Sequence, residues 1–261
     1  MATLQKDTCA LSIIIINYKT PDLTLSVVNM LDLSPETELI VVDNSPTSEL
    51  KDNLSQKKQL TYIKNSKNIG FAAAVNQAAN QSRGEWLVLL NSDTKTDIKA
   101  LQKLITIAEK HDAQVAAPQL VHDNQVEKSV GYFDSFTKHP LNSIFARPRA
   151  IEAHSNEPIW VDLATGGVLL IKRTLFNDIG QFDALQFFMY FEDIDLSYRL
   201  KQAGISILHV PEVKIEHLGG KSADQDKIQK QKNYQHSLQN YLAKHKGKVI
   251  LRLNNLIHAF S

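Results

Sequence analysis

Cysteine is almost absent from this sequence of 261 residues, in which Cys9 is the only example. A single thiol excludes an intrachain disulfide and a zinc site built from cysteines. Such a composition suits a reducing compartment. We therefore expect a cytoplasmic protein whose fold depends on its hydrophobic core and not on crosslinks.

A strong net charge and a long hydrophobic run are also lacking. The formal net charge is +1 at pH 7, so the chain has no broad attraction for nucleic acid, and we expect no nucleic-acid partner. The apolar run at residues 11–16 is far shorter than the ~20 residues of a membrane span. The sequence therefore predicts no membrane span, and it is compatible with a protein that binds peripherally to the inner face of a membrane.

The glycine-rich fingerprints of common nucleotide-binding proteins are missing as well. No Gly-x-Gly-x-x-Gly sequence occurs, which excludes the usual dinucleotide fingerprint. The segment at 219–222 resembles the end of a P-loop, but Ile215 stands where that loop requires its first glycine.

What the sequence does contain is an alternation of apolar strands and helices. Continuous β-branched or leucine-rich runs predict strands that are covered on both faces. The alternation predicts an α/β fold with a mostly parallel, Rossmann-like sheet flanked by helices. The predicted strands are 11–17, 38–43, 60–64, 85–90, 114–118, 168–171 and 205–210, and the predicted helices are 21–31, 71–81, 98–111 and 226–245.

We expect one domain with a C-terminal helical tail. Residues 1–222 carry the strand–helix pattern, but 119–160 lose it and contain three prolines, which indicates an excursion or a lid. Residues 223–261 should form a helical extension that packs on the same domain. The lysines of this extension suit an anionic membrane surface, and a solvated helix face explains them equally well.

Polar side chains stand at the ends of several predicted strands. Asn17, Asp43 and Asp93 fall where ligands bind in parallel sheets. Asp93 suits a divalent metal ion that bridges a diphosphate, which needs hard oxygen donors, and Asp43 suits hydrogen bonds from a pyrimidine or ribose. Turns and helix caps favour the same residue types, so both interpretations stay open.

Two adjacent carboxylates, Glu192 and Asp193, follow an apolar and aromatic segment at 187–191. Burying an acid is costly unless it holds a proton, a cation or a substrate hydroxyl. A partly desolvated carboxylate is well suited to take a proton from an attacking hydroxyl group. The alternative is that the acids only complement a helix N-terminus; we favour the catalytic interpretation.

Taken in order, these motifs resemble family 2 glycosyltransferases with the GT-A fold, especially bacterial rhamnosyltransferase-like members. The resemblance runs from about residue 11 to 222, and the ordered combination is what makes it specific. The matching pieces are Ile-Ile-Ile-Asn-Tyr at 14–18, Val-Val-Asp-Asn-Ser at 41–45, Asn-x-x-Asn-Ile-Gly-Phe-Ala at 65–72, Asn76, Leu-Leu-Asn-Ser-Asp at 89–93, Ala-Thr-Gly-Gly at 164–167, Phe-Glu-Asp-Ile-Asp-Leu at 191–196, and His217.

The resemblance implies an inverting transfer of a sugar, with rhamnose as one option, in the synthesis of cell-surface polysaccharide. The donor would be a nucleoside-diphosphate sugar of the dTDP or UDP type, and the acceptor a saccharide that is free or linked to a lipid. The implied cofactor is Mg²⁺ or Mn²⁺, bound by Asp93 and His217. Asp193 would be the catalytic base, with Glu192 beside it on sugar hydroxyls.

Further positions take roles from the same resemblance. The donor would be bound by Asn17, Asp43, Asn68, Gly70, Asn76, Asn91 and Asp93, and the acceptor side would be lined by Gly166 and Gly167. If this is right, folding must bring Asp93, Asp193 and His217 to one cleft at a rim of the sheet.

The chain departs from the family pattern at two places. Asn91 replaces the first acid of the Asp-x-Asp motif, which leaves one fewer negative charge for the metal. The tail segment 233–241 lacks the arginine that rhamnosyltransferases often carry, so the donor sugar is left open.

The alternatives to an active glycosyltransferase are a degenerate protein that only binds nucleotide sugars, and a sugar-1-phosphate nucleotidylyltransferase. The latter would need a glycine-rich loop at 17–21.

Overall fold

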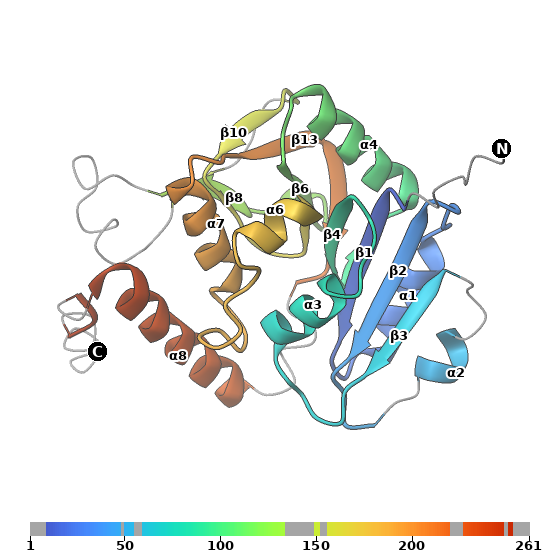
Figure 1. The fold of residues 1–261 in the computed structure, drawn as a ribbon, viewed down its shortest axis with the longest axis horizontal. Helices are drawn as coiled ribbons and strands as arrows, with labels where there is room; N and C mark the ends of the chain where they lie inside the picture. Colours follow the sequence, from blue (N-terminus) through green and yellow to red (C-terminus); the bar gives the residue numbers. More distant parts are fainter. Residues whose placement is uncertain are drawn as a thin grey trace, which may run out of the picture.

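A central sheet with helices on both faces is the main feature of the fold, in agreement with the predicted fold class (Figure 1). The computed structural model describes residues 9–47, 50–54, 59–133, 149–151, 156–219, 227–247 and 250–252. Its strands are β1 (Leu11–Asn17), β2 (Thr37–Asp43), β3 (Leu60–Lys64), β4 (Trp86–Asn91), β5 (Thr94–Lys95), β6 (Val115–His122), β7 (Gln125–Val126), β8 (Val130–Tyr132), β9 (Arg149–Ile151), β10 (Ile159–Val161), β11 (Leu163–Ala164), β12 (Val168–Lys172) and β13 (Ile207–His217).

The main path of the central sheet runs β10-β13-β6-β12-β4-β1-β2-β3. The pairs among β1, β2, β3 and β4 are parallel, as expected for strands that are separated by helical connections. β12 lies antiparallel between β4 and β6, an insertion that the alternation of elements does not predict. β8, β9 and β11 form a separate small sheet.

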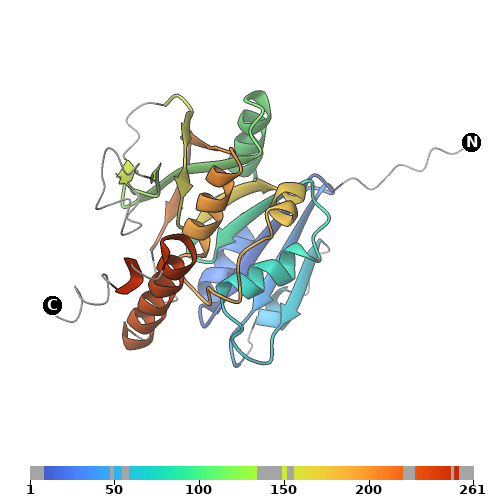
Figure 2. The same cartoon turned by 60° about the vertical axis from the view of Figure 1, so that its left-hand side comes forward.

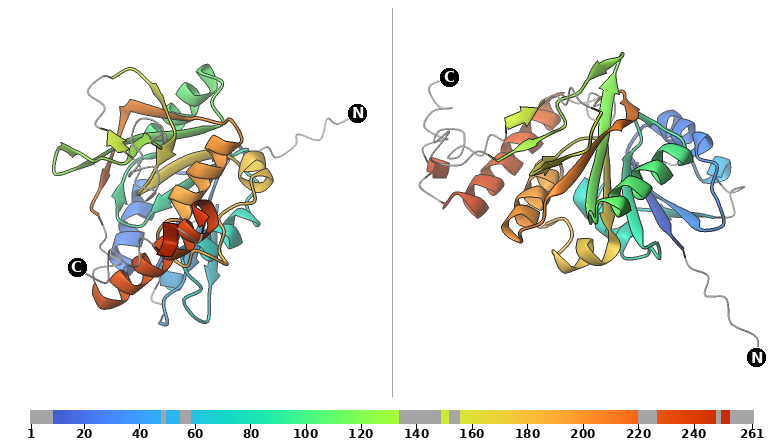
Figure 3. Two further views of the ribbon diagram at one scale, coloured as in Figure 1. Left: turned by 90° about the vertical axis from the view of Figure 1, so that its left-hand side faces the viewer. Right: turned by 90° about the horizontal axis from the view of Figure 1, so that it is seen from above.

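Helices cover the two faces and enclose two hydrophobic cores (Figure 3). They are α1 (Pro21–Met30), α2 (Leu50–Leu54), α3 (Phe71–Ala79), α4 (Ile98–Lys110), α6 (Arg173–Asp178), α7 (Glu192–Gln202) and α8 (Lys227–His245). α1, α2 and α4 pack on one face, and α3, α6 and α7 pack on the other.

The unbroken apolar run of β1 follows from these two cores. Successive side chains of a strand point to opposite faces. Ile13 and Ile15 therefore enter one core, and Ile14 and Ile16 enter the other. Burying each such side chain stabilises the fold by roughly 1.5–3 kcal/mol. Because both faces of β1 are buried, its sequence lacks the alternating polar residues of a strand with one exposed face.

Two strands continue beyond their predicted ends. β6 extends past 118 and turns back through β7, with Asp123 and Asn124 at φ 46° and 63°. Positive φ at both central residues is typical of a tight two-residue hairpin. β13 continues past Pro211, where a register shift against β6 accommodates a residue that has no amide hydrogen to donate.

The predicted excursion therefore starts with regular structure, although the interpretation of 119–160 as a lid stays a prediction. Residues 134–148 and 152–155 lie outside the described part of the chain, as do 220–226, 248–249 and 253–261, which include both ends of the predicted extension 223–261. Among the described residues, no helix is both long and apolar enough to span a bilayer.

α8 lies beside α7 and shares a third hydrophobic cluster with the segment that precedes α7 (Figure 2). Asp195 of α7 joins the two helices through its fully buried carboxylate. Its oxygens lie 2.8 Å from Arg199 Nη2, 2.8 Å from Lys244 Nζ and 2.7 Å from His245 Nε2. Burial alone would raise the pKa of Asp195, but hydrogen bonds from His245 and Lys244 and the charge of Arg199 lower it.

Asp195→Asn should lower the free energy of unfolding by about 3 kcal/mol, because it leaves cations around a buried site without their counter-charge. A lowered pKa means that this contribution is present above the ordinary carboxyl value and is lost as pH falls through the folded-state value. Urea unfolding at pH 7 and near pH 3 measures both effects.

Asp183→Asn is the matched control, because Asp183 also contacts Lys244 but keeps 26% of its side chain exposed. In this variant the free energy of unfolding should fall by less than about 1 kcal/mol. Equal losses in the two variants would contradict the role of Asp195 as the anchor of α8.

Candidate active site

A cavity of about 650 Å³ opens beside the carboxyl ends of the parallel strands. Its wall is formed by segments that follow β1, β2 and β4, by the starts of α7 and α8, and by the end of β13. Ligands bind at this rim in open α/β sheets. The predicted site residues on this wall are Asn68, Asn91, Asp93, Gly166, Glu192, Asp193 and His217.

The pairing of β5 with β13 brings Asp93 and His217 together. His217 stands opposite Thr94 in the antiparallel register, and Leu218 N donates to Asp93 O at 2.8 Å. The side chains then face each other, with His217 Nε2 at 3.5 Å from Asp93 Oδ1. Two residues that are far apart in the sequence thus form one side of the cavity.

Gly167 makes room for this histidine. A Cβ atom at position 167 would lie 2.8 Å from His217 Cδ2 and 3.0 Å from Thr94 Cγ2, closer than carbon atoms pack. Gly167 lies behind the imidazole and is not among the residues that line the cavity, whereas Gly166 is. The acceptor role of both glycines stays a prediction.

The pair Asp93 and His217 fits a divalent metal ion. Burial alone would lower the pKa of His217, but the carboxylates of Asp93 and Glu127 raise it to about 8. Its buried Nε2 has no hydrogen-bond partner among the described residues, and a nitrogen and an oxygen on one wall are suitable ligands. Among the described residues, no group of three or more His, Cys, Asp or Glu side chains could by itself hold a metal ion.

The backbone just before α7 is unusual. Tyr190 and Phe191 both have left-handed conformations, with φ 69° and 66°. Bulky residues rarely adopt this region, since each such conformation costs of order 1–3 kcal/mol and persists only where the surrounding structure imposes it. This turn leads directly into Glu192 and Asp193, so backbone strain accompanies the placement of the acids at the cavity.

The two acids have different surroundings. Glu192 is 7% exposed, and its Oε2 has no hydrogen-bond partner among the described residues. Burial and the neighbouring charge of Asp193 raise the pKa of Glu192 to about 8. Burial also raises the pKa of Asp193, but its carboxylate accepts hydrogen bonds from Ile194 N at 2.7 Å and Gly166 N at 3.4 Å. These amide bonds favour the charged form of Asp193.

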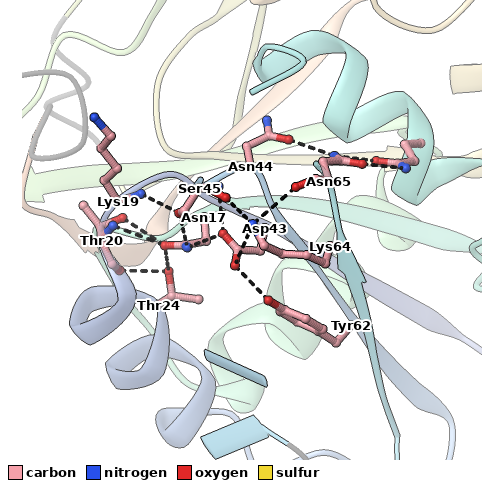
Figure 4. Close-up of polar contacts among 11 residues, drawn as sticks. Asn17, Lys19, Thr20, Thr24, Asp43, Asn44, Ser45, Tyr62, Lys64 and Asn65 are labelled. Atoms are coloured by element: carbon pink, nitrogen blue, oxygen red, sulfur yellow. Dashed lines mark hydrogen bonds and ion pairs between the residues drawn. The ribbon is translucent and has the colours of Figure 1, made fainter. Parts of the chain in front are cut away.

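Asn17 and Asp43 form a buried polar network behind the cavity wall (Figure 4). Asn17 Nδ2 donates to Asp43 Oδ1 at 2.8 Å, and Tyr62 Oη donates to Asp43 Oδ2 at 2.8 Å. Burial alone would raise the pKa of Asp43, but the hydrogen bonds from Ser45, Tyr62 and Asn17 lower it. The network fixes the turns that follow β1 and β2; donor contact by Asn17 and Asp43 stays a prediction.

Gly70 and Asn76 connect α3 to the segment that leads to the acids. A Cβ at Gly70 would lie 2.6 Å from Phe188 O, which accepts a hydrogen bond from Phe71 N at 2.8 Å. Asn76 donates to Phe182 O at 2.8 Å and accepts from Phe182 N at 3.1 Å. These contacts give Gly70 and Asn76 a structural role, and their direct contact with a donor is untested.

The sequence analysis did not single out several residues that belong to this site. Glu127 lies 3.1 Å from His217 Nδ1, through its Oε2. The Asp-Asn pair at 123–124 indicates the hairpin that carries Glu127, because these residue types tolerate positive φ. α8 contributes Gln229, Lys230 and Asn233 to the cavity wall, and no local pattern marks them.

Comparison with known proteins places the chain among glycosyltransferases. Its sequence is 28% identical over 207 residues to the low-salt glycan biosynthesis hexosyltransferase Agl10 of Haloferax volcanii, covering 76% of this chain and 63% of that protein. It is 23% identical over 214 residues to the N-acetylglucosaminyl-diphospho-decaprenol L-rhamnosyltransferase of Mycobacterium tuberculosis, covering 72% of this chain and 68% of the relative. The chain thus spans less than two thirds of the length of the Haloferax relative.

A solved structure agrees with the fold. The mannosyltransferase from Pyrobaculum calidifontis in complex with GDP-Man and Mn²⁺ matches with a TM-score of 0.62 at 15% identity, covering 97% of this chain and 71% of that one. At this identity the match shows the fold alone, which is the expected GT-A type. The profile for "Glycosyl transferase family 2" matches residues 12–180, well over half of the chain. The resemblance found in the sequence is thereby confirmed: the chain belongs to glycosyl transferase family 2.

Proposed function

We propose that this protein is a metal-dependent, inverting glycosyltransferase that moves a hexose-type sugar from a nucleoside diphosphate to a saccharide hydroxyl. One observation carries the proposal: Asp93 and His217 share a cavity with Glu192 and Asp193. The first pair suits a metal-bound diphosphate and the second suits proton transfer. Both parts of the transfer reaction therefore have candidate residues within one space.

The cavity and the relatives support a nucleotide-sugar donor and a saccharide acceptor, and the sequence resemblance favours a UDP or dTDP donor. A volume of about 650 Å³ is in the range of small-ligand sites, which are roughly 300–1,000 Å³. The mannosyltransferase neighbour binds a nucleotide sugar with Mn²⁺, and the mycobacterial relative is named for an acceptor that is joined to a lipid diphosphate. We infer a UDP or dTDP sugar, with rhamnose as the first candidate, and a lipid-linked saccharide acceptor.

Asp93 and His217 would bind Mg²⁺ or Mn²⁺ together with the diphosphate of the donor. When bound, the cation offsets the negative charge that develops on the leaving nucleoside diphosphate. Asn91 lies on the same wall and can donate hydrogen bonds through its amide, whereas a carboxylate at that position could only accept them. The chain therefore presents one formal carboxylate at this motif.

Asp193 would remove the proton from the acceptor hydroxyl, which then attacks the anomeric carbon from the side opposite to the leaving group. The amide hydrogens of Gly166 and Ile194 keep the charge on Asp193 and fix its orientation. Glu192, which retains a proton, can donate a hydrogen bond to a sugar oxygen. A neutral and a charged carboxyl group side by side can thus perform different tasks.

Asp193→Asn should lower kcat by about 10²–10⁴-fold, because it removes the base. Donor affinity should change little, since the metal and nucleotide contacts are left in place. Assays of transfer and of slow donor hydrolysis with Mn²⁺, over a panel of UDP and dTDP sugars, measure the rate, and calorimetry with the nucleoside diphosphate measures binding. A wild-type protein that binds donors but hydrolyses none would favour a degenerate binding protein.

Asp93→Ala should remove the dependence of nucleotide binding on metal. Loss of even an outer-shell partner costs about 10–100-fold in metal affinity, so loss of a direct ligand should cost at least tenfold. Titration of UDP in the presence of Mn²⁺ and of EDTA gives the comparison. If the variant and the wild type gained equally from Mn²⁺, Asp93 would not be a ligand.

Glu192→Gln should flatten the pH dependence of stability. Between pH 4.5 and about 8, the folded chain keeps a proton on Glu192 that the unfolded chain has released. The free energy of unfolding therefore falls as pH rises through this window, and the Gln variant lacks this contribution. From pH 5 to pH 8.5, the melting temperature of the wild type should fall relative to that of the variant. If the two melting temperatures changed in parallel with pH, the raised pKa of Glu192 would be refuted.

A further inference from the structure

The hairpin of β6 and β7 supplies a second carboxylate to His217. Glu127 follows β7 directly, and its Oε2 lies 3.1 Å from His217 Nδ1. The Glu127 side chain is 28% exposed, whereas that of His217 is only 11% exposed. The imidazole thus has a carboxylate at each ring nitrogen: Glu127 at Nδ1 and Asp93 at 3.5 Å from Nε2.

The backbone of the hairpin is well fixed. Val121 pairs with Val126 in the antiparallel register, and Glu127 N donates to Leu120 O at 2.9 Å. His122 Nδ1 lies 2.9 Å from the carbonyl oxygen of His217. The hairpin therefore contacts the main chain of His217 through one residue and its side chain through another.

The contact with Glu127 determines which nitrogen of His217 carries hydrogen. An ionised carboxylate can only accept a hydrogen bond, so Nδ1 must be the donor. In the neutral ring, Nε2 is then left with a lone pair, and it faces Asp93 without a hydrogen-bond partner among the described residues. A flipped ring would place a carbon atom against the Glu127 carboxylate and lose this bond.

Gly167 and Thr94 pack against the edge of the imidazole that carries Cδ2 and Nε2. Gly167 has no side chain, and a Cβ there would already be 3.2 Å from His217 Nε2. The methyl group of Thr94 borders the same space. Packing thus confines the position of the imidazole, while the hydrogen bond from Nδ1 selects its orientation and its tautomer.

We propose that Glu127 is a positioning residue, which holds His217 in the orientation and tautomer that present the Nε2 lone pair beside Asp93 to a divalent metal ion. Metal-binding histidines commonly donate their other ring hydrogen to a carboxylate, which orients the ring and increases its basicity. The metal part of this inference rests on the proposed function, and the tautomer part does not.

The test uses the full chain with Glu127→Ala and Glu127→Gln. Glutamine keeps an oxygen that accepts from Nδ1, so it should preserve the tautomer, whereas alanine should not. Glu216→Gln is the control: it removes a carboxylate one residue from His217 that pairs with Lys95 and has a 37% exposed side chain. Thermal unfolding should show that all three variants fold.

The first measurement is the tautomer of His217 in metal-free protein with ¹⁵N-labelled histidine, at a pH well above the ring's pKa of about 8, where the imidazole is neutral. Its ring signals are identified by their absence in His217→Gln. The wild type, Glu127→Gln and Glu216→Gln should show the hydrogen on Nδ1, and Glu127→Ala should shift the neutral ring toward hydrogen on Nε2. An unchanged tautomer in Glu127→Ala would overturn the proposal, whatever reaction the protein catalyses.

The second measurement is the affinity for Mn²⁺ in the presence of UDP or dTDP, followed by the electron paramagnetic resonance signal of free Mn²⁺. Glu127→Ala should bind the metal about 10–100-fold more weakly, Glu127→Gln less so, and Glu216→Gln like the wild type. Equal affinity in Glu127→Ala would overturn the metal part. If the wild type bound no Mn²⁺ with either nucleotide, the proposed function would fail, and the tautomer would still decide whether Glu127 orients His217.

Discussion

The short pairing of β5 with β13 is the contact on which the candidate active site depends. β5 has only two residues, but its register sets His217 opposite Thr94 and therefore beside Asp93. β13 reaches this point only because it continues past Pro211 with a shift in register. If β13 ended at the proline, the core on the face of α1 and α4 would lose Val213 and Ile215, and the cavity would lose one of its walls.

A second constraint is the crowding of three acids around one cavity, where Asp93 and Glu192 are buried. Asp93, Glu192 and Asp193 all line the same cavity. Each acid has a different neighbour: His217 faces Asp93, burial and the charge of Asp193 raise the pKa of Glu192, and the amide hydrogen of Ile194 contacts Asp193. In the proposed function, the first acid serves a cation and the third serves an incoming hydroxyl group.

Many residues of the family motifs act behind the cavity wall. Asn17 and Asp43 bond to each other, Gly70 admits the carbonyl of Phe188, and Gly167 admits the ring of His217. Their shared effect is to hold the segments that carry the candidate site residues. A residue of such a motif can therefore be needed to position other side chains of the site without touching a substrate itself, because supporting contacts hold those side chains in place.

Local patterns were sufficient for most of the fold. The predicted bounds of β1 and β3 agree with the structure, since each strand is a short run between clear turn residues, and the start of α3 follows from Asn68 and Gly70. The family and the fold type also follow from ordered motifs. The antiparallel insertion of β12 could not be predicted, because a strand's own residues do not specify which strands it will lie between.

The sequence by itself determined the main strands of the sheet, several of the helices, the family and the chemical kinds of residue that a transferase needs. Only the tertiary structure decided which of these residues meet. Glu127 looks like any polar residue in an irregular segment until the hairpin sets it against His217, and residues of α8 reach the cavity because the Asp195 ion pairs and the third hydrophobic cluster hold that helix in place. The reason is physical: contacts between distant residues depend on strand register and helix packing, which no local stretch of sequence encodes.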